Sequence, residues 1–251
     1  MGAGMADFCA RSPFRAEVPV APTVRSSNKS FGTLLIAIAV VGVVALGYVV
    51  SRPAKVITLD PASATGLTAA GIVLGSPEAP VEVTEYADFE CPACGNFAVL
   101  QEPDVRERLV KTGQMRFRFV DFPLDMHRNA VAAHNAAHCA NEQGKFWEMH
   151  DAIFANQGNW NTQATTDPRK VLREIARTVG LDDAAWMECF DSGRMLPQIA
   201  ANRAEAERLR VSSTPSFRIG DRISAGALTF DQIKEAVQQE TARLAGDSAA
   251  R

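Results

Sequence analysis

The sequence predicts a small α/β domain that carries an inserted block of helices and is preceded by one transmembrane helix. Three observations support this prediction: a charge-free apolar run at residues 31–50, alternating strand patterns near both ends of residues 75–245, and helical periodicity between them. The 251 residues carry a formal net charge of −3 and 47% are hydrophobic, which is ordinary for one globular domain with an appendage. The chain has no basic patch interleaved with aromatic residues, so we expect no nucleic-acid partner.

The first 50 residues predict a membrane anchor. Residues 1–30 are rich in Ser, Pro and Arg, as in a disordered cytoplasmic tail, whereas residues 31–50 contain no charge and as a helix span roughly 30 Å, the thickness of a bilayer's hydrocarbon core. Arg25 and Lys29 precede this run, which favours a cytoplasmic N-terminus and an extracytoplasmic domain. A cleaved signal peptide is the alternative, but its small-x-small sequence at 45–47 lies inside the apolar run. We therefore expect an uncleaved signal anchor and a single-pass protein of the cell membrane.

Short periodic segments divide the rest of the chain. Residues 51–74, with two prolines and a Ser-Ala-Thr-Gly run, predict a linker, so the folded domain is expected to begin near Gly75. β-branched and aromatic residues that alternate with polar ones predict strands, and apolar residues three or four apart predict helices. The expected strands are 81–89, 115–120, 216–219 and 223–225; the expected helices follow residue 94, fill about 127–210, and follow Thr229.

Cys91-Pro-Ala-Cys94 stands where the first predicted strand meets the first predicted helix. A cysteine at a helix N-terminus lies over unpaired N–H groups and the positive end of the helix dipole, which favour its thiolate. The second sulfur, one turn later, is close enough to close a disulfide. This arrangement suits reversible thiol–disulfide exchange better than a static disulfide. A zinc site is the other alternative, but no second cysteine pair has similar spacing, and only His134 and His138 leave a mixed site open; we expect no metal.

With this order of elements, the chain resembles the DsbA-like branch of the thioredoxin superfamily over roughly residues 75–245. Three segments carry the resemblance. The first follows a predicted strand and reads Asp88-Phe-Glu-Cys-Pro-Ala-Cys94. The second lies in the helical block and reads Cys139-Ala-Asn-Glu-Gln-Gly-Lys-Phe-Trp-Glu-Met-His150. The third looks like the loop whose cis proline faces the redox cysteines and reads Val211-Ser-Ser-Thr-Pro-Ser-Phe217. The resemblance implies a thioredoxin fold with an inserted helical domain at about 127–210.

The resemblance also implies a role for each matching position. Cys91 is expected to be the nucleophile and Cys94 the buried resolving thiol. Thr214 and Pro215 are expected to lie beside the disulfide and to present backbone groups to an extended substrate segment. Glu85 matches a buried acid that helps proton transfer from the resolving thiol, and burial among apolar neighbours would raise its pKa. The alternative for Glu85 is a partly exposed carboxylate on the strand.

Cys139 and Cys189 are expected to form a second, structural disulfide. An exported domain with four cysteines, two of them paired for catalysis, would rarely leave the other two free. Some members of the DsbA-like branch also carry a second bridge. The alternative is a pair of buried free thiols, because cysteine is among the most buried residue types.

The residues and the resemblance together predict a thiol–disulfide oxidoreductase that introduces disulfides into secreted or cell-envelope proteins through Cys91 and Cys94. Its expected partners are unfolded exported proteins and a membrane quinone-linked reoxidant of the DsbB or VKOR type, and no separate cofactor is implied. Ala93 stands where well-studied members have His, so we expect a less oxidising couple than theirs. An extracytoplasmic reductase or isomerase is the closest alternative function, and a non-catalytic, chaperone-like binding module is a further one.

Overall fold

The computed structural model describes residues 29–50 and 56–249, which divide into two units that we treat separately. The first unit, within residues 1–53, contains helix α1 (Lys29–Val50). The side chains of residues 32–44 are exposed, and those of residues 45–50 are not described. Of the cytoplasmic tail predicted at 1–30, residues 1–28 lie outside the described residues. Within the described residues, no helix is both long enough and apolar enough to cross a membrane.

The second unit, as described from residue 56 to 249, is built on a five-stranded sheet with the order β1-β3-β2-β4-β5. β2 and β3 are parallel, and the other neighbouring pairs are antiparallel. β2 is therefore the middle strand, and the chain leaves β2 and β3 at the same edge of the sheet. The strands are β1 (Ile72–Leu74), β2 (Glu82–Ala87), β3 (Arg116–Asp121), β4 (Ser216–Ile219) and β5 (Arg222–Ala225).

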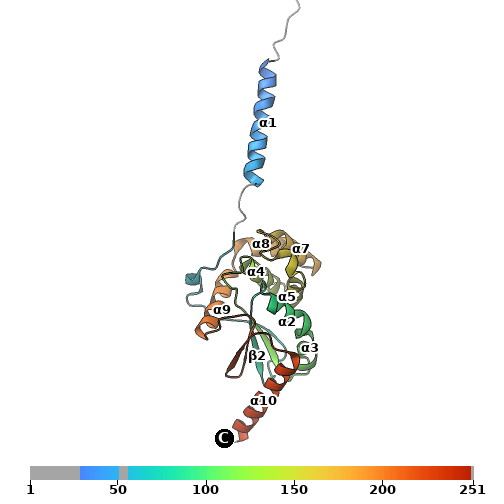
Figure 1. The fold of residues 1–251 in the computed structure, drawn as a ribbon, viewed down its shortest axis with the longest axis vertical. Helices are drawn as coiled ribbons and strands as arrows, with labels where there is room; N and C mark the ends of the chain where they lie inside the picture. The colour runs from blue at the N-terminus through green and yellow to red at the C-terminus, as the bar shows by residue number, and fades with distance from the viewer. Residues whose placement is uncertain (1–28, 51–55, 250–251) are drawn as a thin grey trace, which may run out of the picture. The chain divides into compact units, whose positions relative to one another are not determined.

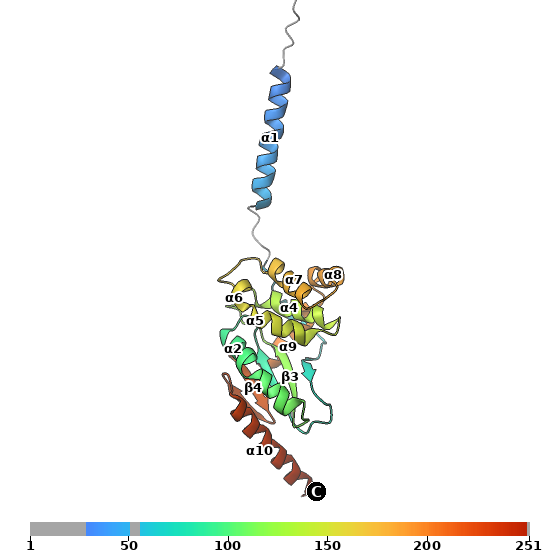
Figure 2. The same cartoon turned by 90° about the vertical axis from the view of Figure 1, so that its right-hand side faces the viewer.

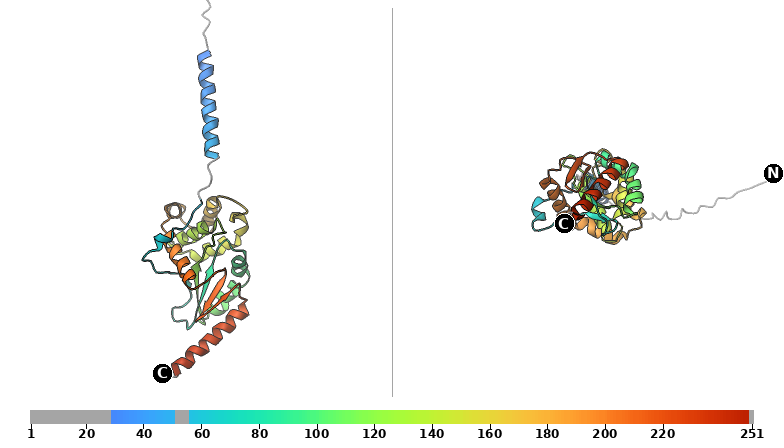
Figure 3. Two further views of the ribbon diagram at one scale, coloured as in Figure 1. Left: turned by 60° about the vertical axis from the view of Figure 1, so that its left-hand side comes forward. Right: turned by 90° about the horizontal axis from the view of Figure 1, so that it is seen from below.

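Helices pack around this sheet (Figure 1). One end of the sheet is covered by α4, α5, α7 and α8, and α10 lies at the other end (Figure 2). There α10 lies near the orange-red β4–β5 hairpin (Figure 3). The run from α4 to α9 fills the range in which the sequence predicted an inserted helical block. The helices are α2 (Pro92–Leu100), α3 (Glu102–Val105), α4 (Ala130–Asn141), α5 (Phe146–Ala155), α6 (Gln157–Trp160), α7 (Arg169–Thr178), α8 (Asp183–Ser192), α9 (Leu196–Arg208) and α10 (Phe230–Ala249), with a 3₁₀ turn η1 (Pro61–Ala64) and a π-helical turn η2 (Arg106–Val110).

The two faces of β2 pack against different helices, because successive side chains point to opposite sides of a strand. Tyr86 belongs to the same apolar cluster as Ala206 of α9. Val83 belongs to a second cluster that includes Phe97 of α2. Glu85 is two residues from Val83, so its carboxylate lies on the face that α2 covers, which is the face of the redox helix.

The folded domain begins earlier than the predicted boundary at Gly75. Residues 72–74, part of the expected linker, form β1, which pairs antiparallel with β3 along the edge of the sheet. Gly71 approaches the same strand closely, since a Cβ atom there would lie 2.5 Å from the Phe119 carbonyl oxygen. Three apolar residues after a run of Ala and Gly form too short a pattern to identify a strand. This part of the linker prediction was therefore wrong.

Candidate active site

Cys91 lies where the chain passes from β2 into α2. β2 ends at Ala87, a turn follows, and α2 begins with Pro92, so Cys91 holds the N-cap position with φ −70° and ψ 122°. Proline suits the first helical position because it has no N–H to leave unpaired and its φ is already helical. Cys91 is 7% exposed and Cys94, one turn later, is fully buried; both are free thiols. A substrate sulfur can therefore reach Cys91 but not Cys94.

Hydrogen bonds lower the pKa of Cys91 to about 5. The largest contribution is a hydrogen bond from the Cys94 thiol; Thr214 and the backbone N–H groups of Cys94 and Ala93 also lower the pKa, whereas burial raises it. Burial, the hydrogen bond to Cys91 and the charge of Glu85 raise the pKa of Cys94 well above its usual range. The two cysteines therefore differ in character near neutral pH: the first is a thiolate and the second a thiol.

Thr214 lies beside Cys91, and Pro215 follows Thr214 in the chain. The peptide bond between them is cis, and the Thr214 carbonyl oxygen is 3.4 Å from the Cys91 sulfur. The buried Thr214 hydroxyl has no hydrogen-bond partner among the described residues, so its proton is available to that sulfur, and Thr214 lowers the pKa of Cys91. The Pro215 carbonyl accepts a hydrogen bond of 2.8 Å from the Gly226 N–H and is held in the β4–β5 hairpin. Thr214 is thus the residue of this loop whose polar groups meet the reactive sulfur.

Glu85 is buried in the middle strand with 1% of its surface exposed, so the alternative of a partly exposed carboxylate is wrong. Its register neighbours on β3 and β4 are both phenylalanines. Burial raises the pKa of Glu85 well above its usual range, the charges of Glu102 and Cys91 add to this rise, and Arg106 opposes it. A buried carboxylic acid with a raised pKa can exchange a proton with a nearby group near neutral pH.

The residues that hold the turn before α2 were not identified from the sequence. Asp88 is fully buried, and its carboxylate accepts a 2.7 Å hydrogen bond from the Leu124 N–H and contacts His127 Nδ1 at 2.7 Å. Gln157 of α6 donates from Nε2 to the Cys91 carbonyl oxygen at 3.0 Å. The pKa of His127 is raised, first by its hydrogen bond with Asp88. Because β2 and β3 are parallel neighbours, the segments that follow them meet at one edge, and this signal could have identified His127.

His134 and His138, whose spacing left a mixed metal site open, both contact Asp121 at the end of β3. His134 Nδ1 and His138 Nε2 lie 2.6 and 2.7 Å from its two carboxylate oxygens, and Asn202 Nδ2 donates to the same carboxylate at 2.6 Å. All four side chains are buried. Among the residues that the structure describes, no group of three or more His, Cys, Asp or Glu side chains could hold a metal ion. This cluster joins α4 and α9 to the sheet.

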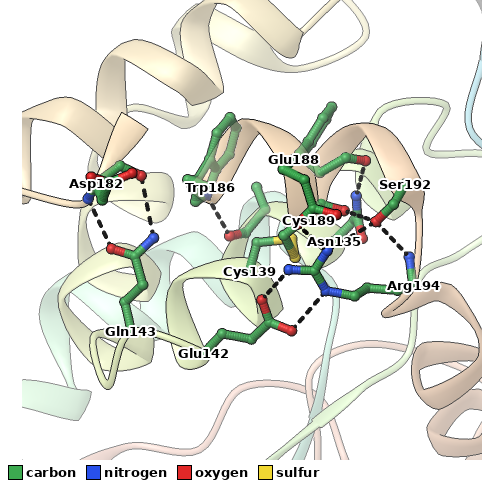
Figure 4. Close-up of a disulfide and its surroundings, with 12 residues drawn as sticks. Asn135, Cys139, Glu142, Gln143, Asp182, Trp186, Glu188, Cys189, Ser192 and Arg194 are labelled. Atoms are coloured by element: carbon green, nitrogen blue, oxygen red, sulfur yellow. Dashed lines mark hydrogen bonds and ion pairs between the residues drawn. A yellow bond between two sulfur atoms is a disulfide. The ribbon is translucent and has the colours of Figure 1, made fainter. Parts of the chain in front are cut away.

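Cys139 of α4 and Cys189 of α8 form a disulfide, as the sequence analysis expected (Figure 4). Both residues are fully buried, and the alternative of two buried free thiols is wrong. Beside the bridge, the Trp186 indole N–H donates to the Ala136 carbonyl oxygen at 3.1 Å, which also joins α8 to α4. Because neither sulfur reaches solvent, this bridge supports the helical block and takes no part in exchange with substrates.

Comparison with known proteins agrees with this geometry. The family model described as thioredoxin matches residues 67–239. The crystal structure of Wolbachia pipientis alpha-DsbA1 has a TM-score of 0.62 at 24% identity, over 72% of this chain and 96% of that chain. Disulfide bond formation protein D of Bacillus subtilis is 24% identical over 170 residues, which cover 67% of this chain and 76% of that protein.

A third relative is a much longer protein. The Na(+)/H(+) antiporter NhaA 3 of Salinispora tropica is 39% identical over 166 residues, which cover 66% of this chain. The match covers 24% of that protein, so this chain spans about a quarter of the relative's length. Because the family model covers more than half of the chain and a DsbA structure shares its fold, the chain belongs to the thioredoxin family, with the DsbA-like form of its fold.

Proposed function

We propose that this chain is a thiol–disulfide oxidoreductase that introduces disulfides into unfolded exported proteins through Cys91 and Cys94. One observation carries the proposal: a single turn of α2 presents one sulfur whose pKa is about 5 and buries a second whose pKa lies well above its usual range. A thiolate that is stable at neutral pH is an available nucleophile and a good leaving group. The similarity to a relative named disulfide bond formation protein D supports the oxidising direction.

Oxidation of a substrate starts from the Cys91–Cys94 disulfide. A substrate thiolate attacks the Cys91 sulfur, the bond between the two cysteines breaks, and Cys94 leaves with the electron pair and takes up a proton. A second substrate thiolate then attacks the substrate sulfur of the mixed disulfide, and Cys91 leaves as a thiolate. The substrate has lost two electrons and the enzyme dithiol has gained them. The low pKa of Cys91 favours the second step, because a weakly basic thiolate leaves readily.

Turnover requires an acceptor for these two electrons. We assign this role to a membrane quinone-linked partner of the DsbB or VKOR type, which an enzyme held at the membrane would meet directly. The dithiol carries the electrons to this partner, so no separate cofactor is required. Extracytoplasmic location is also supported by the buried second disulfide, since such bonds form and persist in oxidising compartments.

Residues 31–50 are proposed as an uncleaved signal anchor that places the catalytic domain on the outer side of the cell membrane. The segment contains no charged residue, and Arg25 and Lys29 precede it. Mass spectrometry of the membrane-extracted protein tests the anchor. Residues before Phe31 are expected in the mature protein, whereas a mature N-terminus at Tyr48 would show that the segment is a cleaved signal.

Refolding of reduced ribonuclease, measured beside the reduction of insulin, tests the direction of exchange. The oxidised protein should restore ribonuclease activity, and the Cys91→Ala protein should not. The Cys94→Ala protein is the matched variant: it should form mixed disulfides through Cys91 that it cannot resolve. Insulin reduction without ribonuclease recovery would make the protein a reductase, and neither activity would make it a binding module; both results contradict the proposal.

A further inference from the structure

Each cycle of the proposed exchange moves a proton to or from Cys94, and solvent cannot deliver this proton directly. Cys94 is fully buried. The charge of Glu85 raises the pKa of Cys94, so the two groups lie within electrostatic reach of each other. Glu85 is itself only 1% exposed. A proton that Glu85 gives to Cys94 must therefore be replaced through other buried groups.

Two further buried titratable side chains, Glu102 and His150, connect to the surroundings of Glu85. Glu85 is in register with Phe119 on β3, and the ring of His150 from α5 packs edge-on against Phe119 with 5.2 Å between ring centroids. His150 Nε2 lies 3.7 Å from Glu102 Oε2, and of the charged groups Glu102 has the largest effect on the pKa of Glu85. Glu85, Glu102 and His150 are each 1% exposed or less, and we call them the Glu85 cluster.

Every member of the Glu85 cluster has a polar atom without a hydrogen-bond partner among the described residues. These atoms are Glu85 Oε2, Glu102 Oε2 and His150 Nε2. Buried polar groups are normally paired, so three unpaired atoms in one cluster need an explanation. A small side-chain movement or a bridging water would close the 3.7 Å separation between Glu102 and His150. Titratable groups that transfer protons need atoms free to form new hydrogen bonds. In a buried cluster that only supports the structure, by contrast, the hydrogen bonds are normally all formed.

The outer end of the cluster reaches solvent through Asp151. His150 Nδ1 lies 2.8 Å from Asp151 Oδ1 and 3.2 Å from Arg106 Nη2. The Asp151 side chain is 56% exposed, and with Arg106 and Phe154 it lines a surface groove. An imidazole can accept a proton at one ring nitrogen and release the proton of the other. His150 is therefore placed to pass a proton between Glu102 and Asp151.

We propose that Glu102 and His150 relay a proton between Glu85 and solvent at Asp151. Arg106 helps to position the relay, since its Nε and Nη2 donate to Glu102 Oε1 at 2.7 and 2.5 Å and leave Oε2 free to face His150. Because Arg106 also forms an ion pair with Asp151 at 2.9 Å, it links the buried and the exposed carboxylates.

The relay rests on the proposed exchange of disulfides and balances over one cycle. When a substrate thiolate attacks Cys91, Cys94 leaves as a thiolate and takes the proton of Glu85. The relay then returns one proton from solvent to Glu85. When the dithiol is reoxidised, the relay first releases the proton of Glu85 to solvent, and the Glu85 carboxylate then accepts the proton of Cys94 and keeps it. One proton enters and one leaves, so the enzyme ends each cycle unchanged.

The experiment measures the step in which Cys94 leaves. The oxidised full-length protein is mixed with excess dithiothreitol between pH 5 and 8, and loss of the Cys91–Cys94 disulfide is followed in a single turnover by acid quenching. Alkylation of the reduced protein by iodoacetamide is measured in parallel, because it reports on the Cys91 thiolate alone. The variants are Glu102→Gln and His150→Gln. Glu107→Gln, an exposed glutamate in the next turn, is the matched control.

Glu102→Gln and His150→Gln should each slow the loss of the disulfide by about tenfold or more and change its pH profile. Alkylation at Cys91 should stay the same, and the double variant should be no slower than the slower single variant, because the two groups act in series. If both variants lose the disulfide at the wild-type rate while Glu85→Gln loses it slowly, the relay is overturned and the proposed function still stands. No exchange by the wild-type protein would overturn the function itself. If circular dichroism shows that His150→Gln is unfolded, the rate of the Glu102→Gln protein alone decides whether the relay holds.

Discussion

Reduction of the Cys91–Cys94 pair should make the stability of the folded domain depend on pH. The pKa of Cys91 in the folded protein is about 5. A cysteine in an unfolded chain has a pKa of about 8.5. Between these values the folded protein holds the thiolate and the unfolded protein holds the thiol, so unfolding takes up a proton. The free energy of unfolding of the reduced protein therefore rises with pH through this window, and the contribution is lost as the pH falls through about 5.

The expected effect is large enough to measure. Well inside the window the slope is about 1.4 kcal/mol per pH unit, and because Cys91 is half-protonated near pH 5, the gain between pH 5 and 7 is about 2 kcal/mol. The oxidised protein has no thiol at this position and gains nothing from it. Asp121 and His138, whose pKa values are also shifted, titrate in both forms, so their contributions cancel when the two forms are compared.

Guanidinium unfolding at pH 5, 6 and 7, followed by circular dichroism, measures this difference between the reduced and the oxidised protein. The difference should grow by about 2 kcal/mol from pH 5 to 7 in favour of the reduced form. The Cys91→Ala protein with and without reductant corrects for any reduction of the second disulfide. The same measurements are repeated with the Glu85→Gln protein, because the Cys91 charge also raises the pKa of Glu85 and so changes its contribution in the reduced form. A difference that stays constant across this range would refute the low pKa of Cys91.

Three further predictions concern single contacts. Thr214→Val removes the hydroxyl beside the Cys91 sulfur, so the Cys91 pKa, read from thiolate absorbance, should rise by roughly half a unit to one unit; an unchanged titration would contradict this. Replacing Cys139 and Cys189 together by Ala opens a loop with a sequence separation of 50. Denaturant unfolding should then show a loss of about 4 kcal/mol, with alkylation of Cys91 unaffected. Asp121→Asn should cost about 3 to 5 kcal/mol by the same measurement, since it leaves two buried histidines without a charged partner. The loss should be larger at pH 6 than at pH 8, because the raised histidine pKa contributes stability only below that pKa.

The sequence was informative where a local pattern and the final fold agree. The alternating residues 81–89 contain β2, and the Cys-x-x-Cys at their end occupies the first turn of α2. The loop at 211–217 contains the cis Thr214–Pro215 bond, and the Thr214 carbonyl oxygen lies 3.4 Å from the Cys91 sulfur. The strand and the redox turn depend on neighbours in the chain, so their pattern predicted them. The place of the 211–217 loop does not, since Thr214 is 123 residues from Cys91 in the chain, and only the resemblance implied it. The pairing of Cys139 with Cys189 was also predictable, since only two other cysteines remain in the part of the chain that the sequence predicts to be exported.

The sequence was uninformative where function depends on residues that are distant in the chain. Glu85, Glu102 and His150 come from β2, α3 and α5, and no spacing rule joins them. Glu102 lies in the first turn of a short helix, where an acidic residue is ordinary, and His150 lies on an amphipathic helix among apolar neighbours. β1 is too short to show a periodic pattern. The resemblance identified Glu85 by itself, but Glu102 and His150 acquire their roles from burial and from their neighbours, which are visible only in the fold.

The protonation of Cys94 controls the reactivity of Cys91, and this coupling can be tested directly. The hydrogen bond from the Cys94 thiol is the largest cause of the lowered Cys91 pKa, so the thiolate is stable only while Cys94 keeps its proton. Cys94→Ser retains an O–H donor in a similar volume, whereas Cys94→Ala removes the donor. The Cys91 pKa, measured from the pH dependence of iodoacetamide alkylation, should rise by about one unit or more in the Ala protein and by much less in the Ser protein. Equal shifts in the two proteins would show that the helix terminus and its backbone N–H groups set the Cys91 pKa without help from Cys94.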